Sequence, residues 1–235
     1  MDLQDFHGFK IIHLTDGLQH EEAMKMINAD KADGINFNYV TNRAEHLGFL
    51  IACPKIKYIQ INDSTCDYSI INSLSNLEEL LIYTDDRTEI NFQNFPKLKR
   101  VAIDWRPKAK SLFTCSKLEH LFLGKYTEKD LSKLSGMSSL RYLRINTGSI
   151  QSLRGIEHLR ELEELWLMLI PSIKSLDGLQ HLSKLTKVYI DNCKNISDIK
   201  VLDMLPPRTS VTLAGKRTMG ARLQNAENEI CRLDP

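Results

Sequence analysis

The sequence predicts an α/β solenoid, with a curved parallel sheet on its concave face and short 3₁₀ or α turns on its convex face. Three observations predict it. A six-residue apolar pattern occurs seven times, its copies begin 20 to 23 residues apart, and apolar residues at three-residue spacing fill the segments between the later copies. Repeats of this length cannot bury an apolar face alone, so neighbouring turns stack into one elongated core.

The repeated pattern is an apolar residue, two others, an apolar residue, one other and a last apolar residue. Its final part alternates with a period of two, which is typical of a strand with one buried face. Each copy therefore predicts one strand of a parallel sheet. The copies are residues 56–61, 77–82, 98–103, 118–123, 140–145, 162–167 and 185–190.

The segments between the copies predict the convex side. Apolar residues spaced by three suit short 3₁₀ turns. Two early segments look longer and more helical, namely 21–27 and 43–51. The spaced apolar residues of the later segments are Ile150, Leu153, Ile156, Leu159, Ile173, Leu176, Leu179, Leu182, Ile196, Ile199, Leu202 and Leu205.

The pattern from Ile56 to Leu205 resembles the leucine-rich repeat family, in its short-repeat, internalin-like class. The resemblance implies a leucine-rich repeat solenoid. Weaker copies extend it in both directions, so we expect about ten turns. Their template residues are Phe9, Ile12 and Leu14, then Ala32, Ile35 and Phe37, then Arg208, Val211 and Leu213.

One position departs from the family pattern. The family usually has Asn or Cys eight residues after the first strand residue, where the side chain bonds the backbone of neighbouring turns. Only Cys193 fits here, so the resemblance implies that most of this polar ladder is absent and that the middle turns are irregular. The other occupants are Ser64, Asp85, Arg106, Tyr126, Gly148 and Ile170.

We expect one domain over residues 1–235. Residues 1–31 would form an N-terminal cap and a first weak turn, 32–213 the repeats, and 214–235 a C-terminal capping helix. The helix is predicted by an apolar stripe with spacings of 4, 3, 4 and 3. The same spacing suits a dimerisation helix, so a monomer and a weak homodimer both stay open. The stripe is Met219, Leu223, Ala226, Ile230 and Leu233.

Composition limits the classes of partner. The chain has 31 Lys and Arg against 30 Asp and Glu, a net charge of +1. This balance gives no general attraction to nucleic acid or to an anionic membrane. The N-terminus has no signal-peptide pattern and no apolar run is long enough to span a bilayer. The five cysteines are odd in number and widely spaced. A reducing, cytoplasmic location is therefore expected.

The strand residues between the buried positions should face solvent on the concave side. Several are aromatic or apolar where polar residues would be the default, with arginines among them. Trp, Tyr and Arg dominate binding hot spots, so we interpret this set as a protein-binding face. The alternative is that the aromatics only pack on each other across strands, which stabilises a sheet by about 0.2–1 kcal/mol per pair. The set is Tyr58, Leu81, Tyr83, Arg100, Phe122, Tyr142, Arg144, Trp166, Met168 and Tyr189.

No motif for catalysis, metal binding or a cofactor is apparent. Gly215-Lys216-Arg217-Thr218 resembles the end of a phosphate-binding loop, but Ser210 stands where that motif needs its first glycine. There is no His-Glu-x-x-His and no Cys-x-x-Cys pattern, so a zinc site is not expected. Cys115 and His120 lie close in sequence, but we expect Cys115 to fill core and His120 to face outward.

These observations favour a non-catalytic protein-binding module, acting as a scaffold, adaptor, regulator or inhibitor that neutralises its partner. Two alternatives stay open. One is an enzyme or enzyme subunit with a site at an irregular turn. The other is nucleic-acid binding through the basic region 97–117, which Asp104 and Glu119 interrupt. A small-molecule site is not expected, because the face is too open.

Overall fold

The computed structural model describes residues 3–14, 19–37, 47–62, 67–83 and 88–215. They form one eleven-stranded sheet whose strands follow each other in sequence order. β1 pairs with β2 in the antiparallel direction, and every later pair is parallel. The strands are β1 (Leu3–Phe6), β2 (Phe9–Leu14), β3 (Gly34–Phe37), β4 (Tyr58–Ile61), β5 (Glu79–Ile82), β6 (Arg100–Asp104), β7 (His120–Tyr126), β8 (Tyr142–Gly148), β9 (Glu164–Met168), β10 (Lys187–Asp191) and β11 (Ser210–Ala214).

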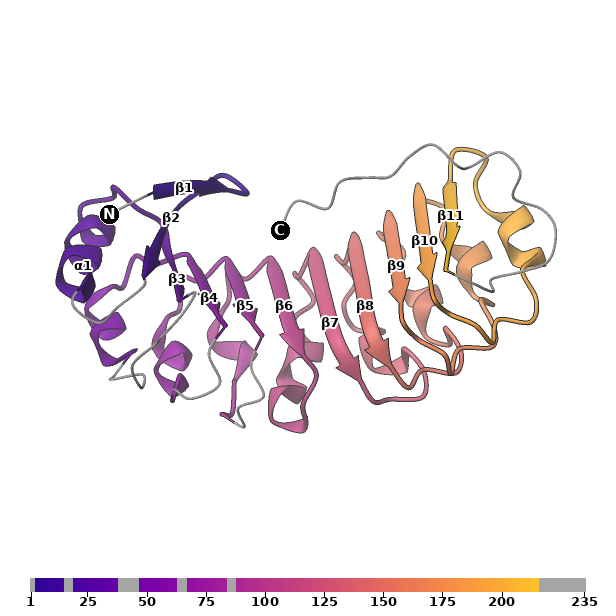
Figure 1. Ribbon diagram of the computed structural model, residues 1–235, viewed down its shortest axis with the longest axis horizontal. Helices are drawn as coiled ribbons and strands as arrows, with labels where there is room; N and C mark the ends of the chain where they lie inside the picture. Colours follow the sequence, from indigo (N-terminus) through magenta and orange to yellow (C-terminus); the bar gives the residue numbers. More distant parts are fainter. Residues whose placement is uncertain (1–2, 15–18, 38–46, 63–66, 84–87, 216–235) are drawn as a thin grey trace.

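The strands curve along the chain and the return segments lie on the opposite side (Figure 1). This arrangement confirms the predicted solenoid. The parallel strands run from β2 to β11, so the weak copies at both ends are true turns of the sheet. Ile12 lies opposite Ile35, and Val188 lies opposite Val211. The template residues thus stack in register from the first turn to the last.

The convex side consists mainly of short 3₁₀ turns, because the returns span little more than the width of the sheet. The helix expected at 21–27 is present as α1 (His20–Asn28). The helix expected at 43–51 is wrong where the structure describes it, because residues 47–52 form a 3₁₀ turn that packs between α1 and the next turn. The 3₁₀ turns are η2 (Leu47–Ala52), η3 (Ser69–Ser73), η4 (Phe92–Asn94), η5 (Pro107–Thr114), η6 (Ser132–Leu134), η7 (Ile156–His158), η8 (Leu179–His181) and η9 (Lys200–Met204).

One apolar core runs through all described turns, from Ile12 to Val201. The position eight residues after the first strand residue, where the family usually has a polar ladder, contributes apolar side chains to this core in the middle turns. Tyr126 and Ile170 are fully buried there, and in β7 and β8 the position belongs to the sheet itself, since Tyr126 pairs with Gly148. Cys193 behaves as the family pattern implies: its Sγ lies 3.7 Å from the carbonyl oxygen of Leu167 in the preceding turn.

The N-terminal cap is a hairpin formed by β1 and β2. His7 and Gly8 make its turn, both with positive φ. Figure 1 shows that β1 projects over the concave side near β3 to β5. The predicted C-terminal helix, residues 214–235, falls almost wholly outside the described residues. Its capping and dimerisation roles stay predictions.

Candidate protein-binding face

The register of the sheet aligns the outward-facing strand residues in columns. The first column contains Tyr58, Glu79, Arg100, His120, Tyr142, Glu164 and Lys187. The second contains Gln60, Leu81, Ala102, Phe122, Arg144, Trp166 and Tyr189. A third, from β6 onward, contains Asp104, Gly124, Asn146, Met168 and Asp191. The sequence-predicted face is therefore a real alignment of side chains on one side of the sheet.

The N-terminal part of this face is covered by the hairpin. The rings of Phe6 and Phe9 both lie 6.0 Å from the ring of Tyr58, measured between centroids. Tyr58 is 1% exposed and Leu81 is 8% exposed. The expectation that these two residues face solvent is wrong, because β1 and β2 supply a second layer that the repeat pattern does not contain.

A buried carboxylate joins the hairpin to the sheet. The Nδ1 atom of His7 lies 3.0 Å from Oε1 of Glu79, and Arg100 donates from Nη1 to Oε2 of Glu79 at 3.2 Å. The Nη2 atom of Arg100 lies 3.3 Å from Nε2 of His120. Arg100, predicted as a binding residue, is thus already engaged with Glu79, whose side chain is almost fully buried.

His120 makes this network sensitive to pH. Burial, followed by the neighbouring Arg100 guanidinium, lowers its pKa to about 4. His120 in the folded protein therefore stays neutral at pH values where the same histidine in the unfolded chain, with a pKa near 6.5, is already protonated. Stability should be full above that pH and fall as the pH drops toward 4.

We expect His120 to account for a loss of about 1–3 kcal/mol between pH 7 and pH 4, a range reduced because the ring is partly exposed. The check is the free energy of unfolding against pH for wild type and His120→Gln. The difference between the two curves isolates His120 from other titrating groups. Parallel curves would contradict the prediction.

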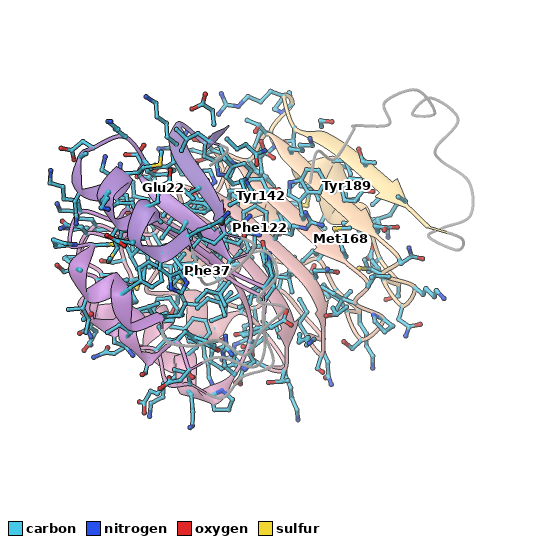
Figure 2. All side chains as sticks on the ribbon, turned by 60° about the vertical axis from the view of Figure 1, so that its left-hand side comes forward. Glu22, Phe37, Phe122, Tyr142, Met168 and Tyr189 are labelled. Carbon is cyan, nitrogen blue, oxygen red and sulfur yellow. The ribbon has the colours of Figure 1, made fainter. Side chains whose placement is uncertain are left out.

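The C-terminal part of the face, beyond the hairpin, carries a chain of aromatic rings. Ring centroids are 5.0 Å apart for Phe122 and Tyr142, 6.3 Å for Tyr142 and Trp166, and 4.6 Å for Trp166 and Tyr189. Figure 2 labels three of these residues, Phe122, Tyr142 and Tyr189, together with Met168 of β9. The rings do pack across strands, as the alternative interpretation expects.

Trp166 is the centre of this chain and is held on several sides. It is only 7% exposed. Its Nε1 donates to Oε2 of Glu164 at 3.2 Å, and Nζ of Lys187 lies 4.7 Å from the ring centroid. The expectation that Trp166 faces solvent is therefore wrong. It supports the face from within, while Phe122, Tyr142 and Tyr189 keep part of their surface open to solvent.

A hollow of about 210 Å³ opens beside the aromatic chain, over β6, β7 and β8. Tyr83 stands at its edge with 48% of its surface exposed. Arg144 reaches it from β8. The repeat pattern places Asp104, Gly124 and Asn146 in the third column, but it gave no reason to select them. Their role in lining the hollow appears only in the structure.

Leu169 was also missed by sequence reasoning. It follows β9 with a φ of 55°, and it is 47% exposed. Positive φ is uncommon for a non-glycine residue. The equivalent turns at Lys125, Thr147 and Asn192 share this conformation. The geometry of the turn therefore imposes it, and Leu169 adds an apolar side chain to the edge of the face beside Met168.

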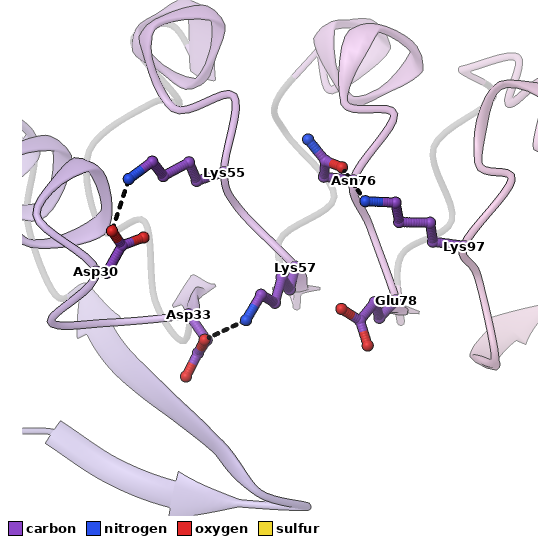
Figure 3. Close-up of a pocket in the computed structure, with 7 residues that line it drawn as sticks. All are labelled: Asp30, Asp33, Lys55, Lys57, Asn76, Glu78 and Lys97. Atoms are coloured by element: carbon purple, nitrogen blue, oxygen red, sulfur yellow. Dashed lines mark hydrogen bonds and ion pairs between the residues drawn. The ribbon is translucent and has the colours of Figure 1, made fainter.

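A second hollow, of about 370 Å³, lies where β3, β4 and β5 begin (Figure 3). Three of its lysines have partners within it. Nζ of Lys55 lies 2.6 Å from Asp30, Nζ of Lys57 lies 3.0 Å from Asp33, and Lys97 donates to the Asn76 side chain at 2.7 Å. These pairs connect neighbouring turns. Their structural role accounts for the charged residues here, and no ligand is needed to explain them.

The basic region 97–117 is similarly engaged in part. Besides Lys97, Lys99 pairs with Glu119, and Arg106 donates to the hydroxyl of Tyr68 at 2.8 Å. These contacts connect successive turns of the solenoid. Three basic side chains of the region therefore have partners within the fold.

In the described part of the chain, Cys115 is a half-buried free thiol. Burial raises the pKa of the Cys115 thiol to about 11, so it is protonated at neutral pH and a poor nucleophile. Within those same residues, no group of three or more His, Cys, Asp and Glu could hold a metal ion. None of the helices that the structure describes has the length and apolarity needed to cross a bilayer.

Comparisons with known proteins bear on the fold. No family model and no curated protein matches the chain. Among solved structures, an internalin (inlF) from Listeria monocytogenes is 17% identical, with a TM-score of 0.54 over 83% of this chain and 71% of that one. The chain has a leucine-rich repeat fold of the internalin-like class. Internalin C2 of the same organism gives 19% identity and a TM-score of 0.56, over 70% of this chain and 74% of that one.

A third similar structure comes from another bacterium. The leucine-rich repeat protein LIC12759 of Leptospira interrogans is 12% identical, with a TM-score of 0.52 over 79% of this chain and 58% of that one. At such identities the likeness establishes the leucine-rich repeat fold alone.

Proposed function

We propose that this leucine-rich repeat protein is a non-catalytic module that binds another protein with the open part of its concave face, over β7 to β10. One observation carries the proposal: a continuous aromatic surface around an arginine begins where the cover of the hairpin ends. Its open residues are Phe122, Tyr142, Arg144 and Tyr189, and the buried Trp166 supports them. These are the residue types that dominate binding hot spots.

The dimensions of the surface suit a protein segment. Adjacent strands lie about 4.8 Å apart, so the outer strands β7 and β10 are separated by roughly 15 Å. That width accommodates a helix of about 10 Å diameter. The packing among the rings supports binding as well, because side chains held in place lose little freedom when a partner arrives.

The wider role belongs to the same proposal. A scaffold, adaptor, regulator or neutralising inhibitor would need no more than this face. A cytoplasmic location is supported by Cys53, Cys115 and Cys193, which the structure shows as free thiols. Reduced thiols are typical of that compartment.

A pull-down from a lysate of the source organism tests the proposal. Wild type is compared with Phe122→Ala/Tyr189→Ala, and with the triple variant that adds Trp166→Ala. The matched control is Ile51→Ala/Met204→Ala, which removes two exposed apolar side chains from the convex side.

We expect a protein that wild type and the control capture and that the face variants lose. The double variant keeps Trp166, so it should stay folded. Thermal melts must show this before the captures are compared. Equal capture by wild type and a folded double variant would overturn the proposal.

A further inference from the structure

The hollow over β6 to β8 is made by the absence of a side chain at Gly124. Its neighbours in the third column, Asp104 and Asn146, both carry polar side chains. A Cβ atom on Gly124 would lie 2.1 Å from Oδ1 of Asp104, so no other residue fits without moving that carboxylate. Asp104 is itself held by Nζ of Lys125 at 2.8 Å. The floor of the hollow is therefore fixed.

Arg144 reaches this hollow from β8. Within the described chain, its guanidinium has no hydrogen bond and no ion pair. The other arginine of the face, Arg100, contacts both Glu79 and His120. Arg144 is half-buried between Phe122 and Trp166 in the second column. A partly desolvated guanidinium with unused donors favours an incoming acceptor.

The charges around the hollow select the kind of acceptor. Arg144 is the one cation among the described residues that line it, and Asp104 lines it too. Asp104 repels any incoming anion, and it repels a phosphate dianion, which meets a single guanidinium, more strongly than a singly charged carboxylate. A carboxylate carries one charge and matches the planar fork of arginine with two parallel hydrogen bonds.

The rest of the lining is suited to an apolar group. The ring of Phe122 lies on one side, and Tyr83 presents an exposed ring at the edge. A volume of about 210 Å³ holds one large side chain rather than a whole domain. The hollow therefore combines one charged contact with one apolar contact.

We propose that this hollow is the anchor subsite of the binding face: Arg144 receives an Asp or Glu side chain of the partner protein, and an adjacent apolar side chain of the partner fills the space between Tyr83 and Phe122. This inference rests on the proposed function and specifies the chemistry of the partner. It requires an acidic residue beside an apolar one in the segment that binds.

A small probe tests the subsite without knowledge of the partner. 3-Phenylpropanoate joins a carboxylate to a phenyl ring, 3-phenylpropanamide lacks the charge, and acetate lacks the ring. Each is titrated into ¹⁵N-labelled full-length protein, and the Arg144 Nε–Hε signal and the Gly124 amide signal are followed by NMR. We expect 3-phenylpropanoate to shift both signals with a millimolar Kd, at least about fivefold tighter than either control compound.

Three variants assign the effect to Arg144. Arg144→Gln should weaken 3-phenylpropanoate binding about tenfold or more, and Arg144→Lys should weaken it less. Arg141→Gln is the matched control, because Arg141 is an exposed arginine just before β8 that pairs with Glu163. It should bind like wild type. Melting temperatures should change little in Arg144→Gln, since no hydrogen bond or ion pair with the described residues is lost.

Two results would overturn the subsite. One is no selective shift by 3-phenylpropanoate in wild type. The other is equal binding by Arg144→Gln and Arg141→Gln. Adding Arg144→Gln to the pull-down separates the two proposals. If Arg144→Gln still captures the partner and Phe122→Ala/Tyr189→Ala does not, the subsite is contradicted and the proposed function is not. If the probe binds at Arg144 but every face variant captures the same proteins as wild type, the proposed function is contradicted and the subsite is not.

Discussion

Replacing Leu143 by alanine is expected to lower the free energy of unfolding by about 2–5 kcal/mol. Leu143 is wholly buried in β8. It lies in register between Leu121 of β7 and Leu165 of β9. In a solenoid each turn contacts only its neighbours. The cavity therefore weakens the packing on both sides of one turn, and no distant element can compensate.

Urea unfolding followed by circular dichroism measures this loss. Leu169→Ala is the matched control, because it makes the same chemical change at an exposed leucine of the next turn. Its effect should stay within about 0.5 kcal/mol, as is usual for surface substitutions. Similar losses of unfolding free energy in the two variants would show that Leu143 is not packed in the core as described.

The fold was predictable because the spacing of the repeat determines how neighbouring strands are aligned. The constant spacing of the apolar pattern aligned the strands, and the period of two assigned each side chain to the core or the concave face. Even the weak copies at Ile12 and Val211 could be placed, since they continued the same spacing. The return at 43–51 was assigned wrongly because an apolar run as short as this one suits an α-helix and a 3₁₀ turn equally well.

The binding face was predictable only in part. The columns are correct, but Tyr58 is covered by Phe6 and Phe9, which lie outside the repeat. A contact such as His7 with Glu79 joins residues 72 positions apart and leaves no periodic signal. Nor does sequence distinguish Arg100 from Arg144. Their difference depends on whether an acidic partner reaches them, which only the folded chain decides.

The second large effect should come from the buried carboxylate beneath the hairpin. Among the described residues, Arg100→Met would leave His7 as the side chain that contacts the Glu79 carboxylate, in a site where the Glu79 side chain is 2% exposed. Removing one partner of a buried pair usually costs more than replacing both by apolar residues. We expect a loss of about 2–4 kcal/mol, reduced from the usual range because the Arg100 side chain is partly exposed.

A double-mutant cycle with Glu79→Met separates this effect from simple loss of contacts. The double variant Glu79→Met/Arg100→Met should lose less than the sum of the single variants, with a coupling of about 1–3 kcal/mol. The control cycle uses Lys184 and Glu161, an exposed pair on neighbouring turns, where coupling should stay at about 0–1 kcal/mol. Additive losses at Glu79 and Arg100 would mean that these two side chains do not act as a coupled buried pair. Strong coupling would show that the pair stabilises the sheet beneath the hairpin, where His7 contacts the same carboxylate.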